Sequence, residues 1–279
     1  MPIKVYRPMT PGLRGTSVLK DPNISKNKPL KSLTKGGKNF AGRNNTGKVT
    51  VRHHGGGYTK VLRTVDFKRD KFEIPGKVEA LEYDPGRTAS IARVLFKDGE
   101  RRYIVAPIDL KVGDSVITSK TTFVRQAGSC FPLEIIPPGS FIYNVELVPG
   151  KGGKLARSAG TAIILQVIEG EYAQLKMPST EVRLVPKKCL ACLGQVSNME
   201  FRNIRWGKAG RMRLRGIKPT VRGKVMNPVD HPHGGGEGSN PIGLKKGPMN
   251  VYGKKAMGIK TRKVHKFSSK LILQRRKKK

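Results

Sequence analysis

Positive charge is concentrated at the two ends of the 279-residue chain, which limits how much of it can fold around a core. Residues 1–60 contain 13 Lys or Arg and one acidic residue, and residues 201–279 contain 23 basic and two acidic residues. Residues 61–200 are nearly balanced, with 20 basic and 16 acidic residues. We therefore expect a globular middle, long enough for roughly two domains, between two polycationic extensions.

The net charge of +37 favours a polyanionic partner, because a polycation of this density repels itself unless a polyanion neutralises it. Nucleic acid neutralises such a chain by exchanging its condensed counterions for Lys and Arg. Solvated linkers or weak tethers to a membrane surface are the alternatives. The basic residues alternate with Gly, Pro and Asn instead of forming an amphipathic helix, and this pattern favours nucleic acid.

The three cysteines, Cys130, Cys189 and Cys192, predict no disulfide framework and a reducing compartment. The Cys189-x-x-Cys192 pair lacks the second pair of a zinc ribbon, so we expect small buried hydrophobic residues and no metal. No apolar run approaches the roughly 20 residues of a membrane span, and the N-terminus lacks a secretory signal. We expect no membrane contact and a protein that works in the compartment where it is made.

Short β-rich runs between turn signals predict a mainly β fold. Residues 58–125 contain five such runs, with a hairpin at Asp98–Gly99, and suggest a closed barrel of the OB-fold type. Residues 126–200 have the proportions of an SH3-like barrel, with turns at 169–171 and 178–179. The extensions, residues 1–57 and 201–279, are expected to be irregular and ordered only on a partner. A short helix is predicted over 203–210.

The aromatic residues indicate how such a protein would recognise RNA. Recognition of single strands needs a row of exposed aromatic side chains, and no such row is evident. We expect the aromatic residues of the barrels to lie mostly in the core: Phe67, Phe72, Tyr83, Phe96, Tyr103, Phe141 and Tyr143. The sequence therefore favours recognition of folded RNA through its shape and backbone.

The stretch "GKGGKLARSAGT", residues 150–161, is rich in glycine and basic residues. It fails the Walker pattern, because no Lys–Ser or Lys–Thr pair follows a glycine at the required spacing. We expect it to contact RNA backbone through Lys151, Lys154 and Arg157.

Two segments, "HHGGGY" (53–58) and "HPHGGG" (231–236), each combine two histidines with three glycines. A catalytic His231 assisted by Asp230 or Glu237 is one hypothesis, but no nucleophile or rigid scaffold accompanies it. Metal binding is a second, and glycines offer ligands no rigid platform. Contact with RNA suits the residue types best, with Asp230 and Glu237 organising the loop.

Several stretches resemble one family, that of the bacterial-type large-subunit ribosomal protein two: "YDPGRTASIARV", "LVPGKGGKLARSAGT", "NPVDHPHGGGEG" and "PIGLKK". The resemblance is collinear over nearly the whole chain. It implies an OB-fold followed by an SH3-like barrel, with both extensions threaded into large-subunit ribosomal RNA. It also implies a position near the peptidyl transferase region, a role in joining the subunits and support for transfer RNA binding. RNA would perform the chemistry, so no enzyme activity and no cofactor are expected.

The partners implied are ribosomal RNA, other ribosomal proteins, the small subunit at its interface and nearby transfer RNA. The segment "PMNVYG" (248–253) stands where the family has a tryptophan, and Ser239 stands where most members have a basic residue. The tail is more similar to plastid-encoded members, so a chloroplast ribosome is favoured over one in a bacterial cytoplasm. A basic architectural protein for DNA is the remaining alternative, and the extensions lack a recognition helix.

The predicted RNA-binding residues lie in both extensions and in the 150–161 stretch. They are Arg43, Arg52, His53, His54, Lys60, Lys151, Lys154, Arg157, Arg202, Arg205, Lys208, Arg211, Arg213, Arg215, Arg222, Asn227, His231, His233, Gly234, Gly235, Gly236, Lys245, Lys246 and Arg262.

Overall fold

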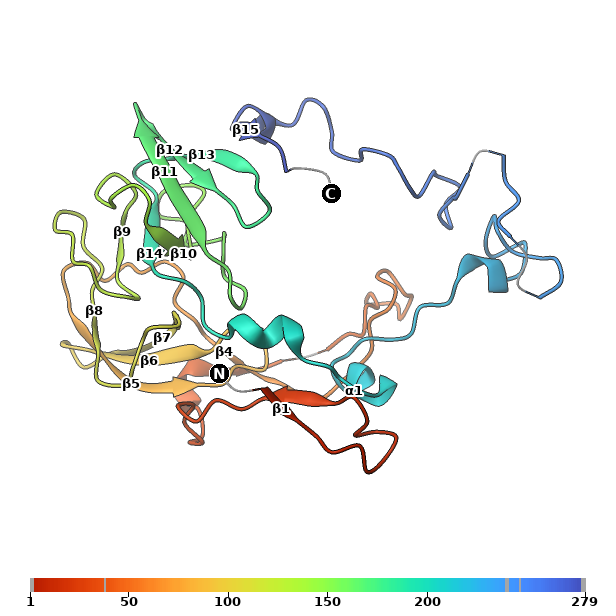
Figure 1. Ribbon diagram of the computed structural model, residues 1–279, viewed down its shortest axis with the longest axis horizontal. Coiled ribbons are helices and arrows are strands. Elements are labelled where there is room, and N and C mark those ends of the chain that lie inside the picture. The colour runs from red at the N-terminus through yellow and green to blue at the C-terminus, as the bar shows by residue number, and fades with distance from the viewer. Residues whose placement is uncertain (1–2, 38, 239–240, 246, 277–279) are drawn as a thin grey trace. The chain divides into compact units, whose positions relative to one another are not determined.

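The protein, seen in a computed structural model, is mainly β, as predicted (Figure 1). The structure describes residues 3–37, 39–238, 241–245 and 247–276. The chain forms two compact units. Unit 1 comprises Met1–Asn39, Thr59–Arg211 and Lys270–Lys279, and unit 2 comprises Phe40–Tyr58 and Met212–Ser269. No helix among the described residues is long and apolar enough to cross a membrane.

The first barrel region of unit 1 contains a four-stranded antiparallel sheet in the order β7-β6-β5-β8. Its strands are β5 (Gly76–Glu82), β6 (Ile91–Phe96), β7 (Arg101–Val105) and β8 (Ser115–Val116). Apolar side chains from these strands, among them Val78, Val94 and Ile104, form one buried cluster. The predicted hairpin joins β6 and β7. The Phe96 N–H bonds to the Glu100 carbonyl, so the turn between these two residues has three residues. One of the three, Gly99, has φ 84°.

The second barrel region contains a seven-stranded antiparallel sheet in the order β15-β13-β12-β11-β10-β14-β9. Its strands are β9 (Cys130–Pro132), β10 (Phe141–Tyr143), β11 (Ile163–Glu169), β12 (Tyr172–Lys176), β13 (Val182–Pro186), β14 (Leu190–Leu193) and β15 (Ile272–Gln274). Both predicted turns are present, between β11 and β12 and between β12 and β13. The last strand comes from the C-terminal extension: β15 extends the sheet beyond β13, so this extension is not irregular throughout (Figure 1).

The two barrel regions pack directly against each other within unit 1. A buried cluster joins Ala89 and Val105 of the first region to Tyr143 and Val196 of the second. The Tyr143 hydroxyl donates to the Val105 carbonyl at 3.1 Å, and burial raises the pKa of this phenol. The predicted domain boundaries after residues 57, 125 and 200 stay a prediction.

The first part of the N-terminal extension forms short strands instead of an irregular arm. Strands β1 (Ile3–Val5) and β2 (Ser17–Leu19) form a hairpin. A 3₁₀ turn, η1 (Lys31–Leu33), leads into β3 (Thr34–Gly36), which pairs with β4 (Val61–Arg63). The extension is attached to the first barrel, because the Tyr103 hydroxyl accepts the Leu30 N–H at 3.1 Å and donates to Glu82 at 2.8 Å.

The helical segments are short. They are η2 (Met199–Asn203), α1 (Ala209–Leu214), η3 (Gly223–Val225) and η4 (Phe267–Ser269). The predicted helix over 203–210 is wrong, because α1 begins at Ala209. Gly207 has φ 74°, and a Cβ on it would lie 1.9 Å from the Thr16 hydroxyl oxygen, so the chain cannot be helical there.

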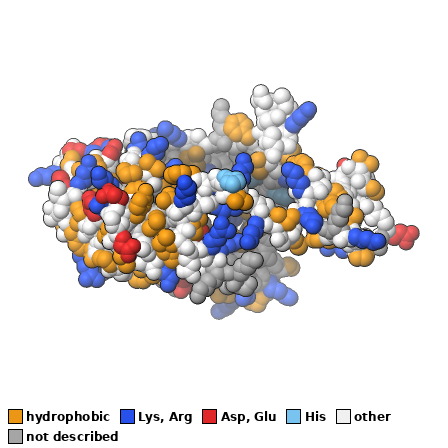
Figure 2. Space-filling model, turned by 90° about the horizontal axis from the view of Figure 1, so that it is seen from above, with side chains coloured by type: hydrophobic (Ala, Val, Ile, Leu, Met, Phe, Trp, Pro, Cys, Tyr) orange, Lys and Arg blue, Asp and Glu red, His pale blue; other side chains and the backbone are white. Residues whose placement is uncertain are grey.

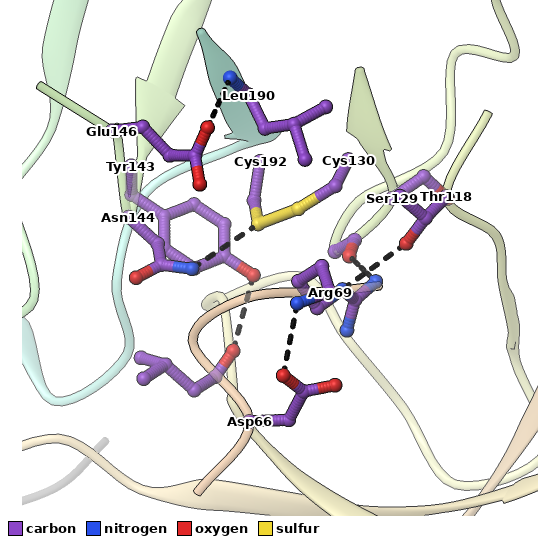
Figure 3. Close-up of a disulfide and its surroundings, with 12 residues drawn as sticks. Asp66, Arg69, Thr118, Ser129, Cys130, Tyr143, Asn144, Glu146, Leu190 and Cys192 are labelled. Carbon is purple, nitrogen blue, oxygen red and sulfur yellow. Dashed lines mark hydrogen bonds between the residues drawn. A yellow bond between two sulfur atoms is a disulfide. The ribbon is translucent and has the colours of Figure 1, made fainter. Parts of the chain in front are cut away.

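The expectation that no cysteine forms a disulfide is also wrong. Cys130 on β9 and Cys192 on β14 lie directly opposite each other in the sheet and form one (Figure 3). Sequence spacing did not reveal this pairing, because the two residues are 62 positions apart and only the strand register brings them together. Cys189 and Cys192 are buried, as predicted, Cys130 is buried as well, and Cys189 is a free thiol.

The aromatic residues of the barrels follow the core prediction only in part. Phe96, Tyr103 and Tyr143 are buried, and Phe67 and Phe72 are half-buried. Tyr83 and Phe141 are 63% and 57% exposed, which contradicts the prediction for these two side chains. Both lie where a strand meets solvent: Tyr83 follows the end of β5, and Phe141 begins β10.

Candidate nucleic-acid interface

The stretch 150–157, called the basic loop below, has a fixed backbone conformation. Gly152 has φ 80°, a value that L side chains rarely adopt. A Cβ on Gly153 would lie 2.2 Å from the Asn144 side-chain oxygen, so only glycine fits there. The glycines of this stretch therefore shape a defined loop.

The basic loop is also attached to the first barrel region through Phe67. The Gly153 N–H donates to the Phe67 carbonyl at 2.9 Å. The guanidinium of Arg157 lies over the Phe67 ring, 4.3 Å from its centroid, and donates to the Gly153 carbonyl at 3.1 Å. Cation–π contact and hydrogen bond together hold Arg157 in one position.

The basic loop forms one wall of a groove of about 710 Å³ within unit 1. The other wall is the segment 64–68, with Arg102 and Glu100 from the β6–β7 hairpin region. The groove is lined by five cationic side chains: Lys68, Arg102, Lys151, Lys154 and Arg157. Three of them, Lys151, Lys154 and Arg157, were predicted from sequence, and the structure brings them together.

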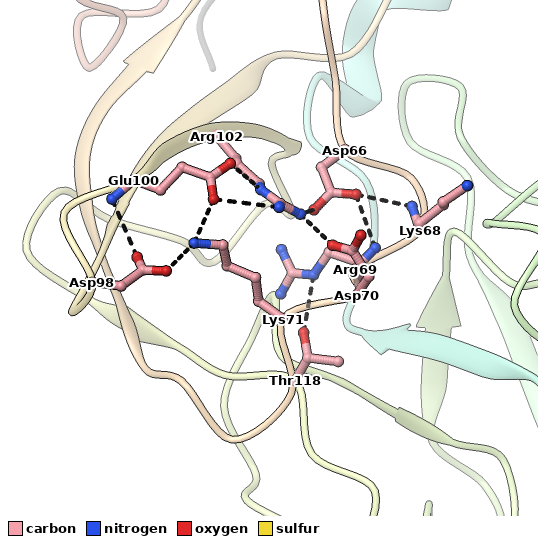
Figure 4. Close-up of polar contacts among 9 residues, drawn as sticks. All are labelled: Asp66, Lys68, Arg69, Asp70, Lys71, Asp98, Glu100, Arg102 and Thr118. Carbon is pink, nitrogen blue, oxygen red and sulfur yellow. Dashed lines mark hydrogen bonds and ion pairs between the residues drawn. The ribbon is translucent and has the colours of Figure 1, made fainter.

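Arg102 does not contribute free positive charge to this groove. Figure 4 shows its guanidinium among the carboxylates of Asp66, Asp70 and Glu100, with 3.0 Å to Asp66 and 2.7 Å to Glu100. Burial opposes its charge, but the hydrogen bonds to these carboxylates hold the pKa of Arg102 above its usual value. Lys71 is neutralised in the same way by Asp98 and Glu100 (Figure 4).

The three lysines of the groove are different. Lys68, Lys151 and Lys154 are exposed, and none of them forms an ion pair with any described residue. Their charge is therefore available to a ligand. The sequence pattern gave no signal for Lys68, because its nearness to the basic loop depends on the tertiary hydrogen bond between Phe67 and Gly153.

Some acidic residues elsewhere in the barrels are also paired locally. Glu79 bonds to Arg93 and Arg101 at 3.0 Å, and the Arg101 hydrogen bond lowers the pKa of its carboxyl group. Asp84 bonds to Arg87 at 2.6 Å. Most of the red Asp and Glu atoms visible in Figure 2 lie at the left of the view, interspersed with blue Lys and Arg atoms. Several carboxylates of residues 61–200 are thus neutralised by arginines close to them, and none of these pairs includes a groove lysine.

Other predicted contacts of unit 1 lie after the second barrel. The side chains of Arg202, Arg205 and Lys208 are exposed, and Arg211 is half-buried. The Arg205 N–H donates to the Ser17 hydroxyl at 2.8 Å, and its carbonyl accepts the Ser17 N–H at 2.9 Å. This pairing attaches residues 199–208 to the β1–β2 hairpin. Lys60, which precedes β4, is half-buried.

In unit 2 the first histidine–glycine segment pairs with a basic one. The Lys218 N–H donates to the His53 carbonyl at 3.0 Å, and the Gly55 N–H donates to the Gly216 carbonyl at 2.8 Å. The side chains of Arg52, His53 and His54 are exposed. So are those of Arg213, in the last turn of α1, and Arg215, just after it. This part of unit 2 therefore presents cations and imidazoles together.

The second histidine–glycine segment is built differently, because its imidazoles bond within the loop. His231 is only 8% exposed, and its Nδ1 accepts the His233 N–H at 3.0 Å. The Nε2 of His233 accepts the Met249 N–H at 2.9 Å. Each ring therefore acts as a hydrogen-bond acceptor for a backbone N–H of its own loop region. Contact of these two histidines with RNA stays a prediction.

This geometry gives no support to the hypothesis of a catalytic His231. Among the described residues, neither Asp230 nor Glu237 forms an ion pair or a side-chain hydrogen bond, and both are exposed. No carboxylate therefore orients the imidazole, as a general base would require. The expectation that these two acids organise the loop is wrong, because backbone groups and the two histidines do so. No group of three or more His, Cys, Asp or Glu that could hold a metal occurs within the described ranges.

The remaining predicted residues of unit 2 are mostly exposed cations and loop residues. Arg43, Arg222, Asn227, Gly236, Lys245 and Arg262 are exposed, and Gly234 and Gly235 are half-buried. Arg262 donates to the hydroxyls of Ser268 and Ser269 at 3.0 and 3.2 Å. Lys246 lies outside the described residues.

Paired β-barrels that carry unneutralised lysines, with polycationic segments at both ends, define a structural RNA-binding protein. Residues 30–118 match the family model of the ribosomal proteins L2, RNA-binding N-terminal domain, and residues 126–253 match that of the ribosomal proteins L2, C-terminal domain. The chain belongs to the ribosomal protein L2 family. It is thus a ribosomal-RNA-binding structural component of the large ribosomal subunit, with ribosomal RNA and other ribosomal proteins as partners.

Proposed function

We propose that this chain holds large-subunit ribosomal RNA near the peptidyl transferase region, and thereby supports subunit association, transfer RNA binding and translation. The observation that carries the proposal is the groove beside the basic loop, where Lys68, Lys151 and Lys154 lack acidic partners among the described residues. Phosphates of folded RNA supply the missing negative charge, and backbone contacts of this kind position a protein on RNA. The exposed cations of unit 2 add a second contact surface.

The groove contact is tested by replacing Lys151 and Lys154 with alanine in the full-length protein. Binding to a large-subunit ribosomal RNA transcript is measured at several salt concentrations. Loss of each phosphate contact lowers the salt dependence of binding, d log K/d log[salt], by roughly one. Lys187→Ala is the matched control, because Lys187 is bonded to Glu171 at 3.1 Å. Equal effects of Lys154→Ala and Lys187→Ala would show that only net charge matters.

The position near the peptidyl transferase region is tested from Val229, which is 96% exposed and lies two residues from His231. An iron chelate is tethered to the new thiol of the Val229→Cys variant, and the labelled protein is reconstituted into large subunits. The positions at which its hydroxyl radicals cleave the RNA are then mapped. Cleavage is expected in the peptidyl transferase region. Cleavage confined to distant RNA would refute the placement. Association with small subunits is followed by sedimentation of the same particles.

A plastid ribosome is part of the proposal, with a bacterial cytoplasm as the alternative. The support is the tail segment, residues 241–276, whose pattern "PIGLKKG…YGKKAMGIKTRK…KLILQRR" resembles plastid-encoded members of the family. Mass spectrometry of large subunits purified from chloroplast stroma would detect peptides of this segment if the assignment is right.

A further inference from the structure

Glu146 is a buried carboxylate in a chain with a net charge of +37, and no cation among the described residues forms an ion pair with it. It is 1% exposed, and it forms no ion pair within the described part of the chain. A buried charge is costly unless hydrogen bonds compensate for the water that it loses. Hydrogen bonds to the Glu146 carboxylate must therefore offset the cost of burying it.

All the hydrogen bonds that Glu146 accepts on its carboxylate come from backbone N–H groups. Oε1 accepts the Gly152 N–H at 2.7 Å, and Oε2 accepts those of Gly150 and Leu190 at 3.1 Å each. Figure 3 shows the carboxylate directed at Leu190 on β14. The Glu146 N–H also donates to the Leu190 carbonyl at 2.9 Å. One side chain thus joins β14 to the basic loop.

These bonds fix the part of the basic loop that carries the free lysines. Gly150 and Gly152 flank Lys151, and Lys154 follows two positions later, where its N–H donates to the Val145 carbonyl at 2.8 Å. Successive backbone N–H groups that converge on one anion form a compact turn. Without the anion, these N–H groups would lose their acceptor and the turn would lose its shape.

We propose that Glu146 is a positioning residue for recognition of the RNA backbone: it holds the basic loop in its binding conformation without touching RNA. This inference rests on the proposed function of the loop. It predicts a change in RNA affinity opposite in sign to the change expected from net charge alone. Removing an acidic residue normally strengthens binding to a polyanion, since the protein becomes more positive. Removing the Glu146 charge should instead weaken binding to RNA, because Lys151 and Lys154 would lose their arrangement in the basic loop.

The test compares Glu146→Gln with Glu134→Gln in the full-length protein, with the large-subunit ribosomal RNA transcript as the probe. Glu134 is exposed and lines the same surface pocket as Glu146, so the two variants change net charge equally. Glutamine at 146 directs an NH₂ group at one of the N–H donors, so it cannot accept all three bonds. Glu146→Gln should bind roughly three- to tenfold more weakly, with a smaller salt dependence. Glu134→Gln should bind equally or more tightly.

Equal or tighter binding by Glu146→Gln would overturn the proposal. Should that variant fail to fold, hydrogen exchange on the wild-type protein decides: the Gly150 and Gly152 amides must exchange slowly in the absence of RNA. Fast exchange there would overturn the proposal as well. Glu146→Asp, which keeps the charge on a shorter side chain, should restore part of the affinity lost in Glu146→Gln.

Failure of the proposed function gives a different result. If the Lys151→Ala, Lys154→Ala double variant binds RNA like the wild type, the loop does not contact RNA. If the double variant binds weakly while Glu146→Gln does not, the loop binds RNA and only the positioning role of Glu146 is refuted.

Discussion

The imidazole of His231 lies against the α-carbon of Gly223, so closely that a Cβ on Gly223 would be 2.3 Å from the ring atom Cε1. Gly223 begins η3, and His231 is one of the two histidines whose rings accept hydrogen bonds from loop backbone. The glycine therefore makes room for the imidazole, and the imidazole holds the turn that contains the following glycines. Two residues eight positions apart thus depend on each other.

Gly223→Ala should displace His231 and loosen residues 226–235. The φ angle of Gly223 suits alanine, so the cost is steric, about 1–3 kcal/mol as for overpacked sites. Faster hydrogen exchange of the His233 and Met249 amides is the expected readout. Gly210→Ala is the control, because a Cβ there meets no atom within 4 Å and alanine favours the helix α1. Unchanged exchange in Gly223→Ala would show that the ring relocates without effect on the loop.

The ion pairs around Arg102 should make the first barrel sensitive to acid. Hydrogen bonds from Arg102 lower the carboxyl pKa of Asp70 and, together with bonds from Lys71, that of Glu100. A lowered pKa in the folded state contributes stability above the unfolded-state pKa of about 4, and this stability is lost as the pH falls through the folded-state pKa.

Arg102→Met tests this network by removing the shared cation while keeping an apolar stem. The variant should lose about 1.5–3 kcal/mol at pH 7, the usual contribution of hydrogen bonds to a charged group. Its acid unfolding, followed by circular dichroism, should begin at a higher pH than that of the wild type. An acid transition at the same pH would mean that other carboxylates control unfolding.

Cys189 should be unreactive in the folded protein. Burial, reinforced by the nearby Glu146 charge, raises the pKa of its thiol to about 12. The thiolate is the reactive form, so at pH 8 the native protein should not react with a disulfide reagent at this position. The raised pKa favours folding below the unfolded-state pKa of about 8.5, and this contribution is lost as the pH rises towards 12.

Peptide mapping after alkylation measures the reaction of Cys189. The rate of labelling should follow the rate of unfolding as denaturant is added. Labelling in the native protein at the rate of a free thiol would contradict the burial of this side chain.

Sequence patterns were sufficient for the mainly β fold, the β6–β7 hairpin and the clustering of Lys151, Lys154 and Arg157. Each depends on residues close together in the chain: a turn glycine, an alternating run, or three cations within seven positions. The family resemblance was confirmed for the same reason, because it rests on contiguous motifs. The predicted helix failed at Gly207, because its φ of 74° is not helical, and its backbone lies against the distant residue Thr16.

The amino-acid sequence by itself determined that this chain must bind a polyanion, because the excess of positive charge is a property of composition alone. Only the tertiary structure decided which cations remain available. Arg102 and Lys71 are neutralised by carboxylates that folding brings beside them, whereas Lys68, Lys151 and Lys154 lie in one groove and form no ion pair with any described residue. The tertiary structure also buries His231 and brings Cys130 and Cys192 together in a disulfide. Ion pairs, burial and strand register depend on distances in space, and the order of residues along the chain does not specify those distances.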